Sequence, residues 1–174
     1  MKRLYEELKA RFPLGAFEQR HPHLAFAEVP KEQLVPLITH LRDIHGYTHL
    51  VLMTVVDWLE EQRFQLTYIL HNYDSKTDLT LKVFLPRENP VMDSIHHLWE
   101  QARVYEQELC EMFGISFPGS PRQGEPLILE GWQGPPVMHR DFDTRQFSDE
   151  HYSHRPREER EPEVHMHQNL YPED

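Results

Sequence analysis

The sequence has few of the features on which most catalytic and redox sites depend. It contains a single cysteine, Cys110, among 174 residues. One thiol excludes an internal disulfide, and it excludes an iron–sulfur cluster or cysteine-rich zinc site held by this chain alone. The sequence also has no glycine-rich phosphate-binding loop, so it gives no support for nucleotide binding.

Positive charge and long apolar runs are scarce as well. The formal net charge is -11, and a protein that binds a phosphate backbone needs a basic face, so nucleic acid is not expected as a partner. The longest apolar run covers residues 50–56, whereas a membrane-spanning helix needs about 20 apolar residues. Residues 1–12 lack the apolar segment of a signal peptide. We therefore expect contact with a membrane only through other chains.

The composition changes after residue 117. Residues 1–117 carry periodic hydrophobic patterns, whereas residues 118–174 hold more than half of the 14 prolines and show almost no periodicity. A segment so rich in proline and charge buries too little apolar surface to fold alone. These patterns predict an α+β domain over residues 1–117, with a mixed or antiparallel sheet packed by helices. They also predict a long extended tail over residues 118–174 that lies along a surface, its own or a partner's. Its widely spaced aromatic residues favour a tail that wraps partner subunits, with Trp132 and Phe142 buried.

The spacing of apolar residues predicts the elements of the first domain. In chain order they are a helix at 2–12, two short strands within 15–29, a helix at 33–45 that ends at Gly46, and strands at 49–58, 63–71 and 79–85. Strand 49–58 is apolar on both faces, so we expect it at the centre of the sheet. The last two strands alternate and are joined by a polar loop of hairpin length, so they should pair antiparallel.

The longest predicted helix runs from about Ile95 to Phe113. Asp93 or Ser94 is suited to cap its first turn. Gly114 follows the last apolar residue, which is the usual place for a glycine that ends a helix in the left-handed conformation.

Three glutamates near the end of this helix are candidate acid/base residues. At about 100° per residue, Glu106 falls on the apolar face, and Glu108 and Glu111 point away from it. A buried carboxylate is costly unless it is paired or protonated. In one interpretation, Glu106 is a general acid with a raised pKa in a free-standing small hydrolase. In the other, Glu106 is buried and structural. It then either forms an ion pair, with Arg122 and Arg140 as the candidate partners in this chain, faces several backbone N–H groups, or lies in an interface with another protein.

Four histidines late in the chain are the remaining candidates for metal binding, because imidazole is a ligand for zinc and nickel. They are His151, His154, His165 and His167. Their close spacing in an acidic segment is a weak signal that a solvated tail also accounts for, so no metal site is predicted.

Two stretches resemble the signature of the 30-kDa subunit of respiratory complex I, also called the C-type or J-type subunit: ARVYEQELCEMFGISFPGSP at 102–121 and EGWQGPPVMHRDF at 130–142. In the first, the matching positions are Ala102, Glu106, Glu108, Phe113, Gly114, Ile115, Phe117, Gly119 and Pro121, and Glu111 stands where the family has Asp. In the second, they are Trp132, Gly134, Pro136, Asp141 and Phe142. We count these positions, with the flanking Arg122 and Arg140, as signature or interface residues.

The resemblance implies a scaffold subunit without catalytic, cofactor-binding or metal-binding residues of its own. Such a subunit packs beside a large catalytic subunit, which carries a quinone or [NiFe] site, and near iron–sulfur subunits. The complex is a membrane oxidoreductase that couples electron transfer to ion translocation, and the subunit is peripheral on the cytoplasmic side of the membrane. The departures Gln107, Cys110 and Ser120, where the family has Arg, Tyr and His, leave the branch open. It is either an NADH- or ferredoxin:quinone oxidoreductase or a complex related to membrane-bound [NiFe] hydrogenases.

Overall fold

The computed structural model describes residues 1–152. Its contacts divide the chain into two compact units, residues 1–142 and residues 143–174. His154, His165 and His167 lie outside the described residues, as does the tail beyond Tyr152. The predicted boundary after residue 117 separates a part that folds by itself from a tail that does not. This boundary stays a prediction.

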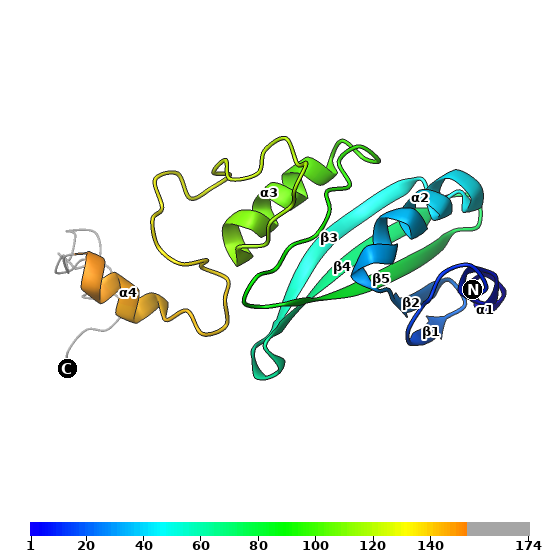
Figure 1. The fold of residues 1–174 in the computed structure, drawn as a ribbon, viewed down its shortest axis with the longest axis horizontal. Coiled ribbons are helices and arrows are strands. Elements are labelled where there is room, and N and C mark those ends of the chain that lie inside the picture. Colours follow the sequence, from blue (N-terminus) through cyan, green and yellow to red (C-terminus); the bar gives the residue numbers. More distant parts are fainter. Residues whose placement is uncertain (153–174) are drawn as a thin grey trace, which may run out of the picture. The chain divides into compact units, whose positions relative to one another are not determined.

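The first unit is built on a five-stranded mixed sheet with the strand order β1-β2-β5-β4-β3 (Figure 1). The strands are β1 (Phe17–His21), β2 (Leu24–Glu28), β3 (His49–Trp58), β4 (Arg63–Asn72) and β5 (Thr77–Pro86). Neighbouring strands are antiparallel except β2 and β5, which are parallel. The predicted α+β class with a mixed sheet is confirmed, and so is the antiparallel hairpin of β4 and β5.

Within the described residues, three α-helices belong to the first unit and one to the second. They are α1 (Lys2–Lys9), α2 (Leu34–His45), α3 (Ala102–Phe113) and, in the second unit, α4 (Thr144–His151). α2 accommodates Pro36 because this residue lies in its first turn, where a missing N–H costs no helical bond. It ends at Gly46, whose φ of 73° is left-handed as predicted. None of the helices within residues 1–152 is long and apolar enough to span a bilayer.

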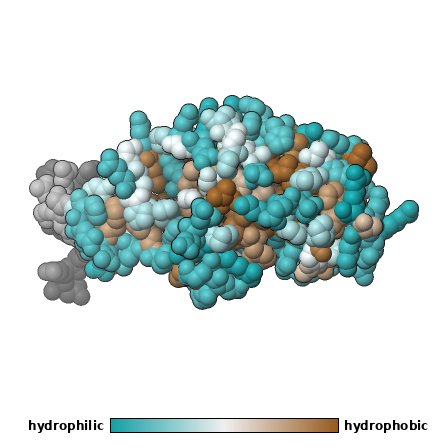
Figure 2. Space-filling view, in the orientation of Figure 1, coloured by the Kyte–Doolittle hydropathy of each residue, from teal (hydrophilic) through white to brown (hydrophobic). Residues whose placement is uncertain are grey.

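The hydrophobic core lies between one face of the sheet and the helices. Alternate residues of β4 and β5 are buried, and they pack with the apolar side of α2. These core residues are Phe64, Leu66, Tyr68 and Leu70 from β4, Leu79, Leu81, Val83 and Leu85 from β5, and Leu34, Leu37, Ile38 and Leu41 from α2. On the surface seen in Figure 2, apolar patches are interspersed among mostly hydrophilic residues.

The strand that is apolar on both faces does not lie at the centre of the sheet. β3 is an edge strand, so this prediction is wrong. One of its faces packs into the core through residues such as Leu50 and Met53, whereas Val51, Leu52 and Val56 are exposed. The apolar second face of β3 therefore does not indicate a second packing layer within the described residues.

Within the described residues, side chains rather than another strand cover the first part of the free edge of β3. The Trp99 indole donates to the carbonyl of Thr48 at 2.7 Å, and the Tyr105 hydroxyl donates to the carbonyl of Val51 at 3.1 Å. Gln101 donates to a carbonyl between these two. The bonds occupy acceptors that an edge strand would otherwise offer to a second chain, which explains how an apolar strand is tolerated at this position.

The helix predicted from Ile95 begins seven residues later, at Ala102. The reason lies in the segment that precedes it. Met92 donates its N–H to the carbonyl of Ser116, and the N–H of Ile95 is bound by a side chain of α3. These contacts turn the chain back along α3, so residues 96–101 form turns instead of extending the helix.

Within the described residues, the predicted tail is irregular over residues 118–142 and then forms one helix, α4. Residues 118–142 contain no helix or strand. The sequence patterns did not indicate α4, which begins just after Asp143. The Asp143 carboxylate caps the helix by accepting the N–H groups of Arg145 and Gln146, each at 3.0 Å.

Candidate functional site: the signature helix and the segment it holds

Glu106 lies on the buried side of α3 and is 1% exposed, which confirms its predicted burial. One carboxylate oxygen accepts the hydroxyl of Ser94 at 2.7 Å, and the other accepts the N–H of Ile95 at 2.8 Å. The predicted pairing with Arg122 or Arg140 is therefore wrong. A general acid must be within reach of the proton it transfers. Glu106 is enclosed and both its oxygens are engaged by the chain, so the geometry favours a structural role over the hydrolase interpretation.

Glu111 lies on another side of α3 and binds three successive backbone N–H groups of the following segment. Its Oε1 accepts from Leu127 and Leu129, each at 2.9 Å, and its Oε2 accepts from Ile128 at 3.1 Å. Gln107, one turn earlier, donates to the carbonyls of residues 125 and 126, at 3.2 and 3.1 Å. The two side chains thus bind the donors and acceptors of one loop, residues 125–130.

A cleft with a volume of about 360 Å³ lies between α3 and this loop. Cys110, Glu111, Leu129 and Trp132 are among the residues that line it. Glu125 also lines the cleft, but the Glu111 carboxylate already accepts three backbone N–H groups, which engages it in holding the loop rather than in acid/base chemistry. Within residues 1–152, no group of three or more His, Cys, Asp or Glu side chains is placed to hold a metal ion.

The end of α3 is the point at which the later segment returns to the helix. Gly114 has a φ of 72°, as predicted for the residue that ends this helix. A Cβ at this position would lie 3.1 Å from the Cγ of Pro136. Met138 donates its N–H to the carbonyl of Met112 at 3.0 Å. A glycine is required here both by the backbone conformation and by the close approach of the returning chain.

Replacing Gly114 by alanine should lower the free energy of unfolding by about 1–2 kcal/mol from the left-handed backbone alone, with a further loss from the contact with Pro136. Gly119→Ala is the matched control, because Gly119 has a φ of 88° and nothing within 4 Å of its missing Cβ. Urea denaturation of the full chain measures both. Equal losses would show that Pro136 moves away freely, and no loss at Gly114 would contradict the conformational requirement.

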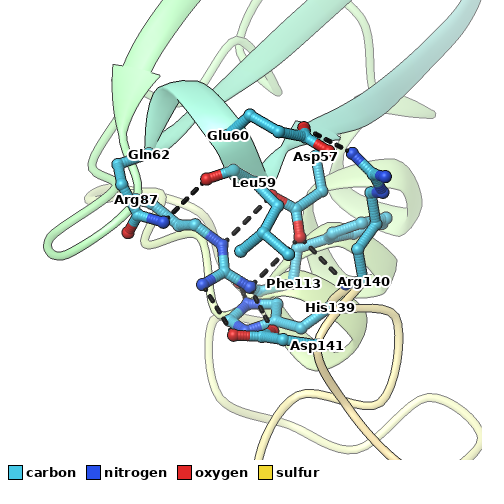
Figure 3. Close-up of polar contacts among 9 residues, drawn as sticks. All are labelled: Asp57, Leu59, Glu60, Gln62, Arg87, Phe113, His139, Arg140 and Asp141. Atoms are coloured by element: carbon cyan, nitrogen blue, oxygen red, sulfur yellow. Dashed lines mark hydrogen bonds and ion pairs between the residues drawn. The ribbon is translucent and has the colours of Figure 1, made fainter.

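A polar network fastens residues 139–141 to the end of the sheet (Figure 3). Arg87, which directly follows β5, makes two bonds to the Asp57 carboxylate of β3, at 3.0 and 3.2 Å. Its Nη1 also donates to Asp141 at 3.1 Å, and its Nη2 makes a second bond to that carboxylate. Asp57 in turn accepts the backbone N–H of Arg140 at 2.9 Å. One guanidinium therefore joins two strands of the sheet to the second signature stretch.

The charges of this network hold one another in the ionised form. The hydrogen bond from Arg87 lowers the pKa of Asp141, and the bond to Asp141 raises the pKa of Arg87, which burial opposes and Asp57 reinforces. A carboxylate whose pKa is lowered in the folded state stabilises it at pH values above its unfolded pKa. This contribution is lost as the pH falls through the folded-state value. The ion pair between Arg87 and Asp141 is therefore fully formed at neutral pH and weakens in acid.

Aromatic contacts accompany the polar ones. The His139 ring lies 5.4 Å from the ring of Phe64, and its Nε2 is 2.9 Å from the carbonyl of Phe113. The rings of Trp132 and Phe142 are 6.2 Å apart and edge to face. Both are half-buried in the single chain. Their full burial against other subunits stays a prediction.

The structure brings most of the signature residues together around α3 and the start of the returning segment. Ile115 and Phe117 are buried, and Phe113 and Arg122 are half-buried. Glu108, Gly119 and Pro121 are exposed. That these positions form an interface stays a prediction.

The sequence patterns indicated neither Arg87 nor Asp57 as part of a site. A signal was present, because each charged residue closely follows the apolar part of a predicted strand. Opposite charges at the ends of two strands in one sheet are candidates for pairing. The pairing itself depends on the strand order, which the sequence patterns do not reveal.

Residues 27–148 match the sequence profile of a family described as respiratory-chain NADH dehydrogenase, 30 Kd subunit. The chain belongs to this family. The C-type subunit of NADH-quinone oxidoreductase from Moorella thermoacetica is 33% identical over 114 residues, which cover 66% of this chain and 76% of that protein. The predicted resemblance to the complex I 30-kDa subunit is thereby confirmed.

Two further comparisons extend the likeness. The combined C/D-type subunit of NADH-quinone oxidoreductase from Pseudomonas paraeruginosa is 28% identical over 159 residues, which cover 84% of this chain and 26% of that longer protein. The solved structure of the membrane-bound sulfane sulfur reductase, an archaeal respiratory membrane complex, contains a chain of the same fold. The TM-score is 0.75 at 20% identity, with 92% of this chain and 96% of that chain covered. At this identity the match establishes the likeness of fold.

Proposed function

We propose that this chain is a non-catalytic scaffold subunit in the peripheral arm of a complex I-like membrane oxidoreductase that couples electron transfer to ion translocation. The observation that carries the proposal is what three side chains of the signature helix α3 bind. Glu106, Gln107 and Glu111 bind the chain's own backbone or a neighbouring hydroxyl, and they shape the segment that follows α3. Residues that hold a segment in place suit a subunit whose role is to position others, because electron transfer and quinone chemistry depend on placement to about 1 Å.

The partner we propose first is the large catalytic subunit of the 49-kDa type. The relative from Pseudomonas paraeruginosa is named as a C/D-type subunit, and a protein that combines two subunits in one chain supports their being neighbours. Iron–sulfur subunits of the same complex are the second partners. Iron–sulfur clusters and the quinone or [NiFe] site belong in this proposal to those neighbours, through which the chain is held on the cytoplasmic side of the membrane.

The names of the sequence relatives favour a quinone oxidoreductase branch over a complex related to membrane-bound [NiFe] hydrogenases. The large subunit that copurifies with this chain distinguishes the two. Cysteine pairs near both ends of its sequence indicate a nickel site, because thiolates are the ligands such a site needs. Their absence indicates a quinone pocket.

Deleting residues 143–174 should leave the first unit folded, because residues 1–142 form a compact unit with their own core. We expect the truncated chain to be incorporated less well into the complex, since the deleted segment is suited to lie along partner subunits. The measurement is the amount of large subunit recovered with an N-terminally tagged chain from the native host, full-length against truncated. A circular dichroism melt serves as the folding control. Undiminished recovery with the truncated chain would count against a docking role for the tail.

A further inference from the structure

The loop of residues 125–130 displays two aliphatic side chains to solvent. Ile128 is 69% exposed and Leu127 is 36% exposed. A single exposed aliphatic residue on a protein surface needs no explanation. Here the two are adjacent, at the tip of a loop whose backbone is bound by a helix.

The backbone of this loop is fixed from one side. Glu111 accepts N–H groups from three successive residues, and Gln107 donates to the two carbonyls that precede them. Gly124 and Gly131, with φ of 80° and 78°, stand on either side of the loop. Since these backbone groups already have partners, the loop has little tendency to add to a strand of another protein. What it presents outward is its side chains.

The charges beside the tip are both negative. Glu125 and Glu130 are exposed, and neither forms an ion pair within residues 1–152. An apolar tip between two carboxylates complements an apolar pocket with a basic rim, because opposite charges around an interface favour the correct partner and register.

We propose that the loop of residues 125–130 is a preformed docking element whose Ile128 inserts into an apolar pocket, rimmed by Lys or Arg, on the large catalytic subunit. This inference rests on the function proposed above. The physical advantage is that a loop ordered before binding loses little conformational entropy on association. Energetically important interface positions usually fill a desolvated pocket and are surrounded by contacts that exclude water, and an aliphatic side chain can serve as such an anchor. We choose the large subunit because the C/D-type relative supports its being a neighbour of a chain of this family.

The test compares two isoleucines that are equally exposed but lie in different places. Ile128→Asp changes the loop tip, and Ile44→Asp changes α2, where Ile44 is 67% exposed. Each variant is expressed as a tagged full chain in the native host, and the large subunit recovered with it is quantified. We expect Ile128→Asp to reduce recovery about tenfold or more, and Ile44→Asp to leave it unchanged. Melting curves that match the wild type show that both variants fold.

A second variant tests the basic rim without touching the apolar tip. Glu125→Lys combined with Glu130→Lys should also reduce recovery of the large subunit, because it places like charges against the rim. Unchanged recovery with Ile128→Asp overturns the proposal, as does loss of an iron–sulfur subunit while the large subunit is retained. If the wild-type chain itself recovers no large subunit, the proposed function fails instead, so the two failures are distinguishable.

Discussion

Replacing Arg87 by alanine is expected to lower the free energy of unfolding by about 3–5 kcal/mol, the largest effect of the substitutions considered. The Asp57 side chain is 1% exposed and takes two hydrogen bonds from Arg87. Without the guanidinium, a carboxylate stays buried in the sheet with no compensating cation. The Asp141 carboxylate also loses its partner, so one of the contacts that hold the returning segment to the sheet is lost.

Arg140→Ala is the matched control for this experiment. The Arg140 side chain pairs with Glu60, and these side chains are 51% and 68% exposed, so the pair is worth less than about 1 kcal/mol. The bond from Arg140 to Asp57 comes from its backbone N–H and persists in the variant. Urea denaturation of both full-length variants at neutral pH gives the comparison. If Arg87→Ala costs no more than Arg140→Ala, the buried network does not stabilise the fold as inferred.

Glu106→Ala should lower the free energy of unfolding by about 2–4 kcal/mol, because it removes the carboxylate that accepts hydrogen bonds from two buried donors. These donors are the Ser94 hydroxyl and the Ile95 N–H. Glu106 also acts on the nearby Tyr68 hydroxyl, whose pKa is raised mainly by burial, with the charge of Glu106 acting in the same direction. Glu108→Ala, at an exposed position of the same helix, is expected to change stability by no more than about 0.5 kcal/mol.

A double-mutant cycle separates the hydrogen bonds from the packing at this site. In the double variant, Ser94→Ala removes one of the two donors that bond to Glu106. The unfolding free energy of the double variant should therefore fall by less than the sum of the losses in the two single variants. The readout is again the unfolding free energy from urea denaturation. Additive losses would mean that the Ser94–Glu106 bond contributes nothing, and the cost of Glu106→Ala would then be one of packing alone.

Much of the local structure follows from short-range patterns. The alternation in β4 and β5 and the polar loop between them predict a hairpin, and the structure contains it. Gly46 and Gly114 end their helices in the left-handed conformation, as expected of a glycine after an apolar helical pattern. The helical period also placed Glu106 on the buried face of α3. Each of these features is set by residues that are near one another in the chain.

The sequence predicted which residues belong to the candidate site, but it did not predict how their side chains are bonded. The signature residues were recognised from the sequence, yet their bonding partners were not. Glu111 was expected to point away from the apolar face, and nothing in the sequence indicated that it would bind the backbone of residues 127–129. A backbone amide carries no sequence signature, so a carboxylate that binds amides cannot be distinguished by sequence from one that faces water.

The sequence by itself determined the order of helices and strands in the first domain, which side of most of them is apolar, and where α2 and α3 stop. These properties depend on periodicity and on the conformational range of single residues. Only the tertiary structure decided that β3 lies at the edge, that α3 begins at Ala102 and that Arg87 joins Asp57 to Asp141. A periodic pattern shows that a face is apolar, but it does not show what covers that face. Similarly, a charged residue finds its partner through strand order and chain return, which bring together residues far apart in the sequence.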